Sequence, residues 1–158
     1  MVKEQIKIPI IAAGGIANGN GMLAAMVLGA DGVQIGSRFA ASVESSAHEN
    51  FKQVILDTNE GDTQLTLKEL TPVRLIKNKF FEDIQELYAK CATKEELAKL
   101  LGRARAKKGI FEGDVIEGEL EIGQIAALIH EIKSAESIVL DIMQEYQLAK
   151  NEVANFLF

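Results

Sequence analysis

Small residues follow two short apolar runs of this sequence, and they are the residues best placed to bind a ligand. Ala13, Gly14 and Gly15 close the first run, and Gly36 and Ser37 close the second. Without a Cβ, glycine lets backbone N–H groups come close to phosphate oxygens, and the Ser37 hydroxyl could add a donor. The two turns therefore predict a phosphate cradle. The alternative is that the glycines only permit tight turns and close helix–sheet packing.

The residues around these turns predict a strand–helix–strand unit with parallel strands. A β-branched run over residues 6–13 is typical of a buried strand, residues 22–28 predict a short helix closed by Gly29, and residues 32–39 predict a second strand. In parallel α/β sheets, ligands bind beyond the carboxyl ends of the strands. In (β/α)8 barrels, a phosphate commonly lies between the loops after strands seven and eight. Both glycine turns are expected at that edge.

The rest of the chain is charged and rich in helical patterns. Helices are predicted over residues 47–57, 73–90, 94–109, 122–132 and from 135 onward. Thr93 and Glu96 form a capping-box pattern, and a short extended piece is expected at residues 65–67. We therefore expect an α/β protein in two parts, a strand–helix–strand part over 1–42 and a helical C-terminal region over 43–158.

The composition excludes several classes of protein. A formal net charge of −6 argues against non-specific nucleic-acid binding, which needs a basic surface. No apolar stretch approaches the ~20 residues that span a bilayer. Cys91 is the only cysteine, which excludes an internal disulfide and fits a reducing cytoplasm, and with the two histidines it matches no metal motif. We expect a cytoplasmic protein that binds a small molecule but no nucleic acid, membrane or metal.

Two other features are weighed as functional candidates. His48 could be a general base after the second strand, but no acidic or nucleophilic partner is arranged around it, so a place at a helix start or in surface packing is preferred. The basic cluster over residues 103–108 could attract an acidic partner. Cations also belong in the last turn of a helix that ends before Gly109, and we adopt that interpretation. No catalytic residue is assigned in this chain.

The segment over residues 8–39, IPIIAAGGIANGNGMLAAMVLGADGVQIGSRF, closely resembles the end of the barrel in FMN-dependent nitronate monooxygenases, formerly called 2-nitropropane dioxygenases. Enoyl-acyl-carrier-protein reductase II, a related flavoenzyme, shares the pattern. The likeness continues through residues 46–52, 73–78, 113–115 and 122–129. It covers most of the chain in order and is weakest over residues 56–70.

This resemblance implies a fold, a cofactor and an activity. The fold is the C-terminal fragment of a (β/α)8 TIM barrel, its last two strands, followed by a helical segment. The FMN phosphate would be held by the turn of Ala13, Gly14 and Gly15 and by the turn of Gly36 and Ser37. Gln124 would belong to the wall near the flavin or substrate. The complete enzyme would oxidise alkyl nitronates with dioxygen.

The chain departs from the family because it begins shortly before what resembles strand seven. Strands one to six, with the histidine that the family uses as base, would be absent, so we expect the chain alone to be inactive. Its unpaired apolar strands predict self-association. Two alternatives stay open: NAD(P)H-dependent reduction by an enoyl-acyl-carrier-protein reductase II, and a non-catalytic helical interaction module that keeps the phosphate turns as relics.

Overall fold

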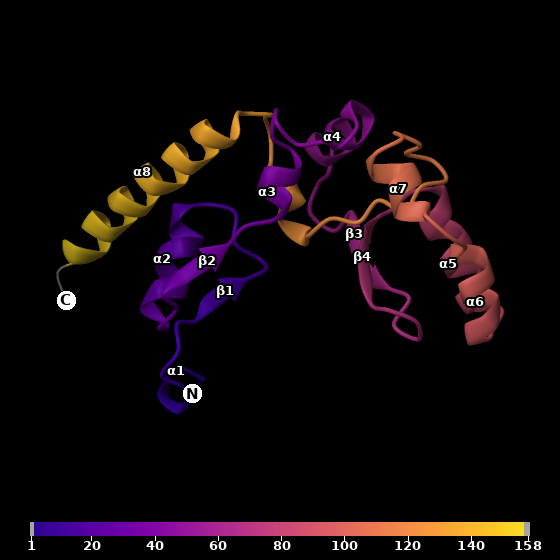
Figure 1. Cartoon of the computed structure of the whole chain (residues 1–158), viewed down its shortest axis with the longest axis horizontal. Helices are drawn as coiled ribbons and strands as arrows, with labels where there is room; N and C mark the ends of the chain where they lie inside the picture. The colour runs from indigo at the N-terminus through magenta and orange to yellow at the C-terminus, as the bar shows by residue number, and fades with distance from the viewer. Residues whose placement is uncertain (1, 157–158) are drawn as a thin grey trace. The chain divides into compact units, whose positions relative to one another are not determined.

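The computed structural model describes residues 2–156 and has a mixed α/β architecture. The chain divides into two units, of which unit 1 comprises residues 1–44 and 133–158 and unit 2 comprises residues 45–132. Figure 1 labels the α-helices and strands of both units. The C-terminal helix falls in unit 1, so the region over 43–158 is shared between the two units.

Unit 1 is built on the expected strand–helix–strand arrangement. Strand β1 (Ile11–Ala13) pairs in parallel with β2 (Gly32–Gln34), and helix α2 (Gly19–Val27) connects them. Both strands are shorter than the sequence pattern predicts. Residues 6–10 precede β1, a short helix α1 (Val2–Gln5) comes before them, and α3 (Ser37–Ala40) replaces the predicted end of the second strand. Strand structure is limited to the residues of β1 and β2 that are paired with each other across the two-stranded ladder.

Local capping sets the ends of α2. Asn18 is its N-cap, and the Asn18 Oδ1 accepts a hydrogen bond of 2.9 Å from the backbone N–H of Gly21. The helix therefore begins at Gly19, three residues before the predicted start at Met22. After the helix, Gly29 has φ +102°, a conformation that favours glycine, as expected for its place after a helix end.

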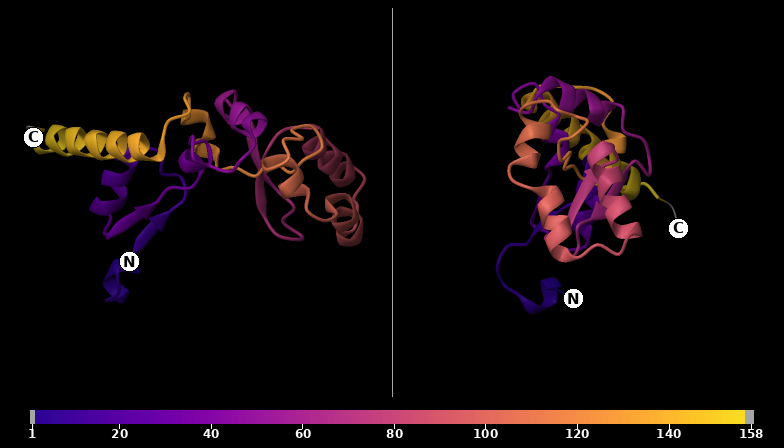
Figure 2. Two further views of the ribbon diagram at one scale, coloured as in Figure 1. Left: turned by 45° about the horizontal axis from the view of Figure 1, so that its top comes forward. Right: turned by 90° about the vertical axis from the view of Figure 1, so that its right-hand side faces the viewer.

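The long C-terminal helix α8 (Ala135–Ala154) packs against α2, and Figures 1 and 2 show the two helices side by side. Its N-cap Ser134 accepts a hydrogen bond from the backbone N–H of Ser137. Of the predicted apolar stripe Ile138, Ile142, Tyr146, Ala149 and Val153, the residues Ile138, Ile142 and Ala149 are buried, whereas Val153 is exposed. The two helices approach so closely that a Cβ on Gly19 would lie 2.1 Å from the backbone nitrogen of Tyr146. The apolar face of α8 thus packs against α2, the helix that connects β1 with β2.

Unit 2 consists of a hairpin and short helices. Its elements are α4 (Glu49–Leu56), β3 (Thr63–Thr66), β4 (Val73–Ile76), α5 (Lys79–Ala89), α6 (Lys94–Leu101), α7 (Arg105–Ile110) and the 3-10 helix η1 (Gln124–Leu128). The strands are antiparallel, with Thr63 opposite Ile76 and Thr66 opposite Val73. The core beneath them is formed by Leu67, Val73, Leu75, Phe80, Phe81, Ile84 and Leu97.

Three predictions of helix in unit 2 differ from the structure. Of residues 122–132, only Gln124–Leu128 are helical, as the 3-10 helix η1. Residues 73–76 form a strand, because they pair with β3 and Leu75 also bridges to Glu121. The helix predicted over 94–109 is broken into α6 and α7, since Gly102 has φ +65° and Ala104 adopts the left-handed conformation. The predicted capping box is confirmed, with the Thr93 Oγ1 and the Glu96 carboxylate each accepting the other's backbone N–H.

No helix within residues 2–156 is long and apolar enough to cross a membrane.

Replacing Gly19 by alanine should destabilise unit 1 by about 3 kcal/mol, because the new methyl group would overlap the backbone of α8. Gly21→Ala is the matched control in the same helix. There the Cβ would lie 3.4 Å from the Ile16 Cγ2, and alanine favours the helix by about 0.5–1 kcal/mol. Urea unfolding followed by circular dichroism measures both changes. Equal stabilities for the two variants would contradict the close approach of α8.

Candidate functional site

The two glycine turns lie at the same edge of the parallel sheet. The register places Ala13, the last residue of β1, opposite Gln34, the last residue of β2. Gly14 and Gly15 therefore leave β1 at its carboxyl end, and Gly36 and Ser37 follow the carboxyl end of β2. This is the edge at which parallel α/β sheets bind ligands.

The backbone of the first turn requires glycine. Gly14 has φ +89° and Gly15 has φ +73°, conformations that other residues adopt only with strain. A Cβ on either residue would meet no atom within 4 Å in the part of the chain that the structure describes. The close-packing alternative thus does not explain these two glycines, although the tight-turn alternative does.

Gly36 is different, because neither its conformation nor its surroundings require glycine. Its φ is −95°, which any residue adopts, and a Cβ there would also meet no described atom within 4 Å. Gly36 is the N-cap of α3, and Ser37 is the first residue of that helix. The two turns therefore offer backbone amides and a hydroxyl beside space that glycine leaves open. This arrangement fits a phosphate group.

Gln124 lies in the other unit. It is the first residue of η1 and is exposed, whereas the glycine turns belong to unit 1. Its expected place in a wall near the flavin stays a prediction.

His48 acts as a helix cap. Its Nδ1 accepts a hydrogen bond of 3.1 Å from the backbone N–H of Asn50, and its own backbone N–H donates to the Ile110 carbonyl over 2.8 Å. The ring also packs against Gly113, where a Cβ would lie 2.3 Å from the Nδ1. These contacts account for His48 as the start of α4, which is the interpretation that the sequence favours.

Arg105 has a structural role that sequence reasoning missed. The predicted place of the basic cluster, in the last turn of a helix ending before Gly109, holds in part: Lys107 and Lys108 lie in the last turn of α7, but that helix begins at Arg105 and includes Gly109. The Arg105 guanidinium lies 4.4 Å from the centre of the Phe80 ring. It also donates to three carbonyls, those of Leu100, Leu101 and Glu117. Only the non-local contacts reveal this role.

The ionisable groups with shifted pKa values lie elsewhere than at the glycine turns. Hydrogen bonds from Lys3 and from the backbone N–H of Ile10 lower the pKa of Asp31, which precedes β2 at its amino end. The backbone N–H of Glu117 and the Lys108 side chain lower the pKa of Asp114. Burial and the nearby Glu121 raise the pKa of Glu119. Hydrogen bonds, ion pairs and burial explain each shift.

Within the described residues, no group of three acidic, histidine or cysteine side chains is arranged to hold a metal ion.

Comparison with known proteins places these features in a family. A family model described as nitronate monooxygenase matches residues 1–145. The chain belongs to the nitronate monooxygenase family. Enzymes of this family are flavin-dependent oxidoreductases.

Curated relatives of the chain are longer than the chain itself. It is 34% identical over 154 residues to a probable nitronate monooxygenase of Staphylococcus saprophyticus, a match that covers 96% of this chain and 41% of the relative. A probable nitronate monooxygenase of Bacillus subtilis is 46% identical over 84 residues, which cover 52% of this chain and 24% of that protein. The chain thus spans less than half the length of these relatives.

Solved structures show the same relationship. FabK from Thermotoga maritima is similar with a TM-score of 0.90 and 37% identity, over 99% of this chain and 50% of FabK. Nitroalkane oxidase from Streptomyces ansochromogenes is similar with a TM-score of 0.73 and 31% identity, over 96% of this chain and 43% of the oxidase. The two resemblances stated from the sequence are thereby confirmed.

Proposed function

We propose that this chain supplies the FMN phosphate-binding turns of a nitronate monooxygenase, as the last two strands of its (β/α)8 barrel. The turn of Ala13, Gly14 and Gly15 and the turn of Gly36 and Ser37 would hold the phosphate. The observation that carries the proposal is the open space beside Gly36, where nothing in the described chain requires glycine. A ligand that needs close backbone approach explains that glycine.

The chain's own residues would bind and orient the cofactor. Backbone N–H groups of the two turns would donate to phosphate oxygens, together with the Ser37 hydroxyl. Gln124 would border the flavin or the substrate. When bound, FMN would supply the redox chemistry between an alkyl nitronate and dioxygen. No residue of this chain is assigned as the catalytic base, so we expect the chain alone to show no turnover.

The test measures FMN binding by flavin fluorescence, with Gly36→Ala as the critical variant. The added methyl group should occupy the phosphate position without straining the backbone, so binding should fall by about tenfold while the unfolding midpoint stays unchanged. Gly21→Ala in α2 is the matched control and should bind like the wild type. Inorganic phosphate should compete with FMN.

The titration is repeated with the chain co-expressed with the part of the Staphylococcus saprophyticus relative that it does not match. If the assembled protein binds FMN equally well with and without Gly36→Ala, the cradle is contradicted. If the two parts assemble and bind no FMN at all, the glycine turns are relics, and the non-catalytic interaction module becomes the better interpretation.

The similarity to FabK supports a second function, the NAD(P)H-dependent reduction of enoyl-acyl-carrier-protein. The two functions differ in electron donor and substrate. Activity assays of a full-length protein that contains this chain therefore distinguish them. A nitronate monooxygenase should consume dioxygen with an alkyl nitronate and leave NAD(P)H unused. A reductase should oxidise NAD(P)H with a crotonyl thioester. NAD(P)H oxidation with the thioester and inertness toward the nitronate would contradict the first proposal.

We also propose that the chain self-associates through the strands of unit 1. Among the described residues β1 and β2 pair only with each other, and the side chain of Ile11 is 56% exposed. Sedimentation across micromolar concentrations should show a mass that rises with concentration, and Ile11→Lys should shift the protein toward monomer. Val153→Lys, at a similarly exposed position near the end of α8, is the control. A strictly monomeric wild type would contradict the proposal.

A further inference from the structure

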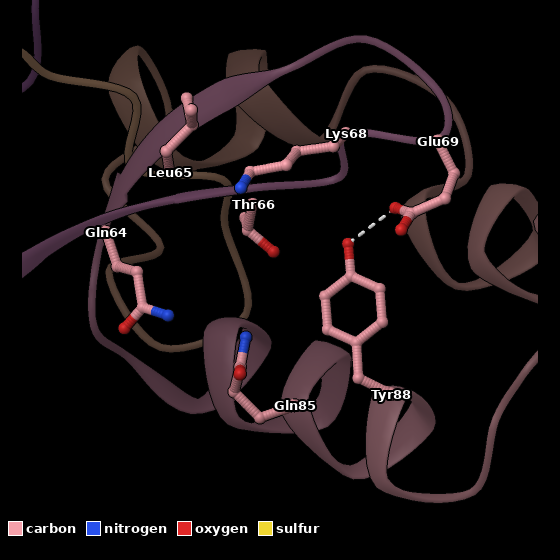
Figure 3. A pocket seen from close by; sticks show the side chains of 7 residues that line it. All are labelled: Gln64, Leu65, Thr66, Lys68, Glu69, Gln85 and Tyr88. Carbon is pink, nitrogen blue, oxygen red and sulfur yellow. Dashed lines mark hydrogen bonds between the residues drawn. The ribbon is translucent and has the colours of Figure 1, made fainter.

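Unit 2 contains a polar pocket of about 300 Å³ between β3, the segment after it and α5. Figure 3 shows the side chains that line it, Gln64, Leu65, Thr66, Lys68, Glu69, Gln85 and Tyr88. None of these residues belongs to the glycine turns or to η1. The phosphate-binding role proposed above therefore leaves this pocket unexplained.

Thr66 carries a buried polar group without a partner. The residue is only 2% exposed, and its Oγ1 makes no hydrogen bond within the part of the chain that the structure describes. Figure 3 shows this hydroxyl pointing toward the space that Gln85 and Tyr88 border. A buried hydroxyl without a partner costs about 1–3 kcal/mol. A ligand hydrogen bond at this position would remove that cost.

One wall of the pocket is already fixed. The Tyr88 hydroxyl accepts the backbone N–H of Leu67 over 2.9 Å and donates to the Glu69 carboxylate over 2.8 Å. Hydrogen bonds from the Glu69 backbone N–H and from this tyrosine lower the pKa of Glu69. The tyrosine ring and the carboxylate are thus held in place before any ligand arrives.

The charges and free groups of the pocket define the ligand that it suits. Lys68 and Glu69 carry opposite charges, so the lining residues bring no net charge to the pocket. The amides of Gln64 and Gln85 make no hydrogen bond within residues 2–156, and both point into the pocket. Amide and hydroxyl side chains can both donate and accept hydrogen bonds. The hydroxyl groups of an alcohol do the same and are therefore suitable partners.

We propose that this pocket binds a neutral polyol the size of a single sugar ring, through hydrogen bonds from its hydroxyl groups to Thr66, Gln64 and Gln85. A volume of about 300 Å³ is in the range of small-molecule pockets and suits a molecule of that size. Because the Thr66 Oγ1 is covered, a lining side chain has to move aside for the ligand to reach it. The ring of Tyr88 forms the apolar side of the site.

The proposal is tested by titrating D-glucose and myo-inositol into the full 15N-labelled chain and following the side-chain amide signals by NMR. The signals of Gln64 and Gln85 should shift saturably with at least one of the two polyols. The signal of the exposed Gln147 on α8 should stay fixed and serves as the internal control. Glycine and inorganic phosphate are titrated in parallel. A saturable response to either of these alone, or to none of the four compounds, would overturn the proposal.

Two variants locate the site. Thr66→Val keeps the shape and removes the hydroxyl, so affinity should fall by about tenfold while the melting temperature rises, because the unpartnered group is gone. Gln85→Leu, at a half-buried position on α5, should weaken binding similarly and carries the test if Thr66→Val fails to fold. Gln147→Leu is the matched control. Polyol binding that survives both substitutions at the pocket would also overturn the proposal.

Discussion

The parallel pairing of β1 with β2 is the constraint on which the candidate site depends, because it brings both glycine turns to one edge. Parallel neighbours cannot be joined by a hairpin, so the chain has to cross over through α2. Helix α2 is in turn held by α8, whose Glu145 carboxylate accepts the backbone N–H of Gly19 over 2.8 Å. Helix α8 therefore holds the crossover helix α2, and this crossover aligns the two strands that lead into the glycine turns.

The glycines of unit 1 have three different physical origins, which the sequence pattern alone does not separate. Gly14 and Gly15 are needed for their backbone conformation, and Gly19 is needed because α8 approaches its backbone. Gly36 has an ordinary conformation and open surroundings within the described chain. Neither its conformation nor its described neighbours explain Gly36, and this is why a ligand beside it is proposed.

The sequence predicts the elements that local signals define. Helix α8 follows its Ser134 cap, and the capping box marks the start of α6. Strand β4 was not predictable, since four apolar-rich residues fit a helix as well as a strand until β3 pairs with them. The role of Arg105 was equally hidden, because the Phe80 ring and the carbonyls that it contacts come together only after folding. Non-local pairing is the common reason for these misses.

The two units differ in how far they can stabilise themselves, and this difference bears on function. Unit 2 buries large side chains such as Phe51, Phe80 and Leu97, whereas β1 leaves Ile11 exposed. A two-stranded sheet is marginal without further strands. Any strand that pairs with β1 or β2, from a second copy or from the remainder of a barrel, would order the residues that carry the glycine turns. Because ligand binding and strand pairing would stabilise the same conformation, each should strengthen the other.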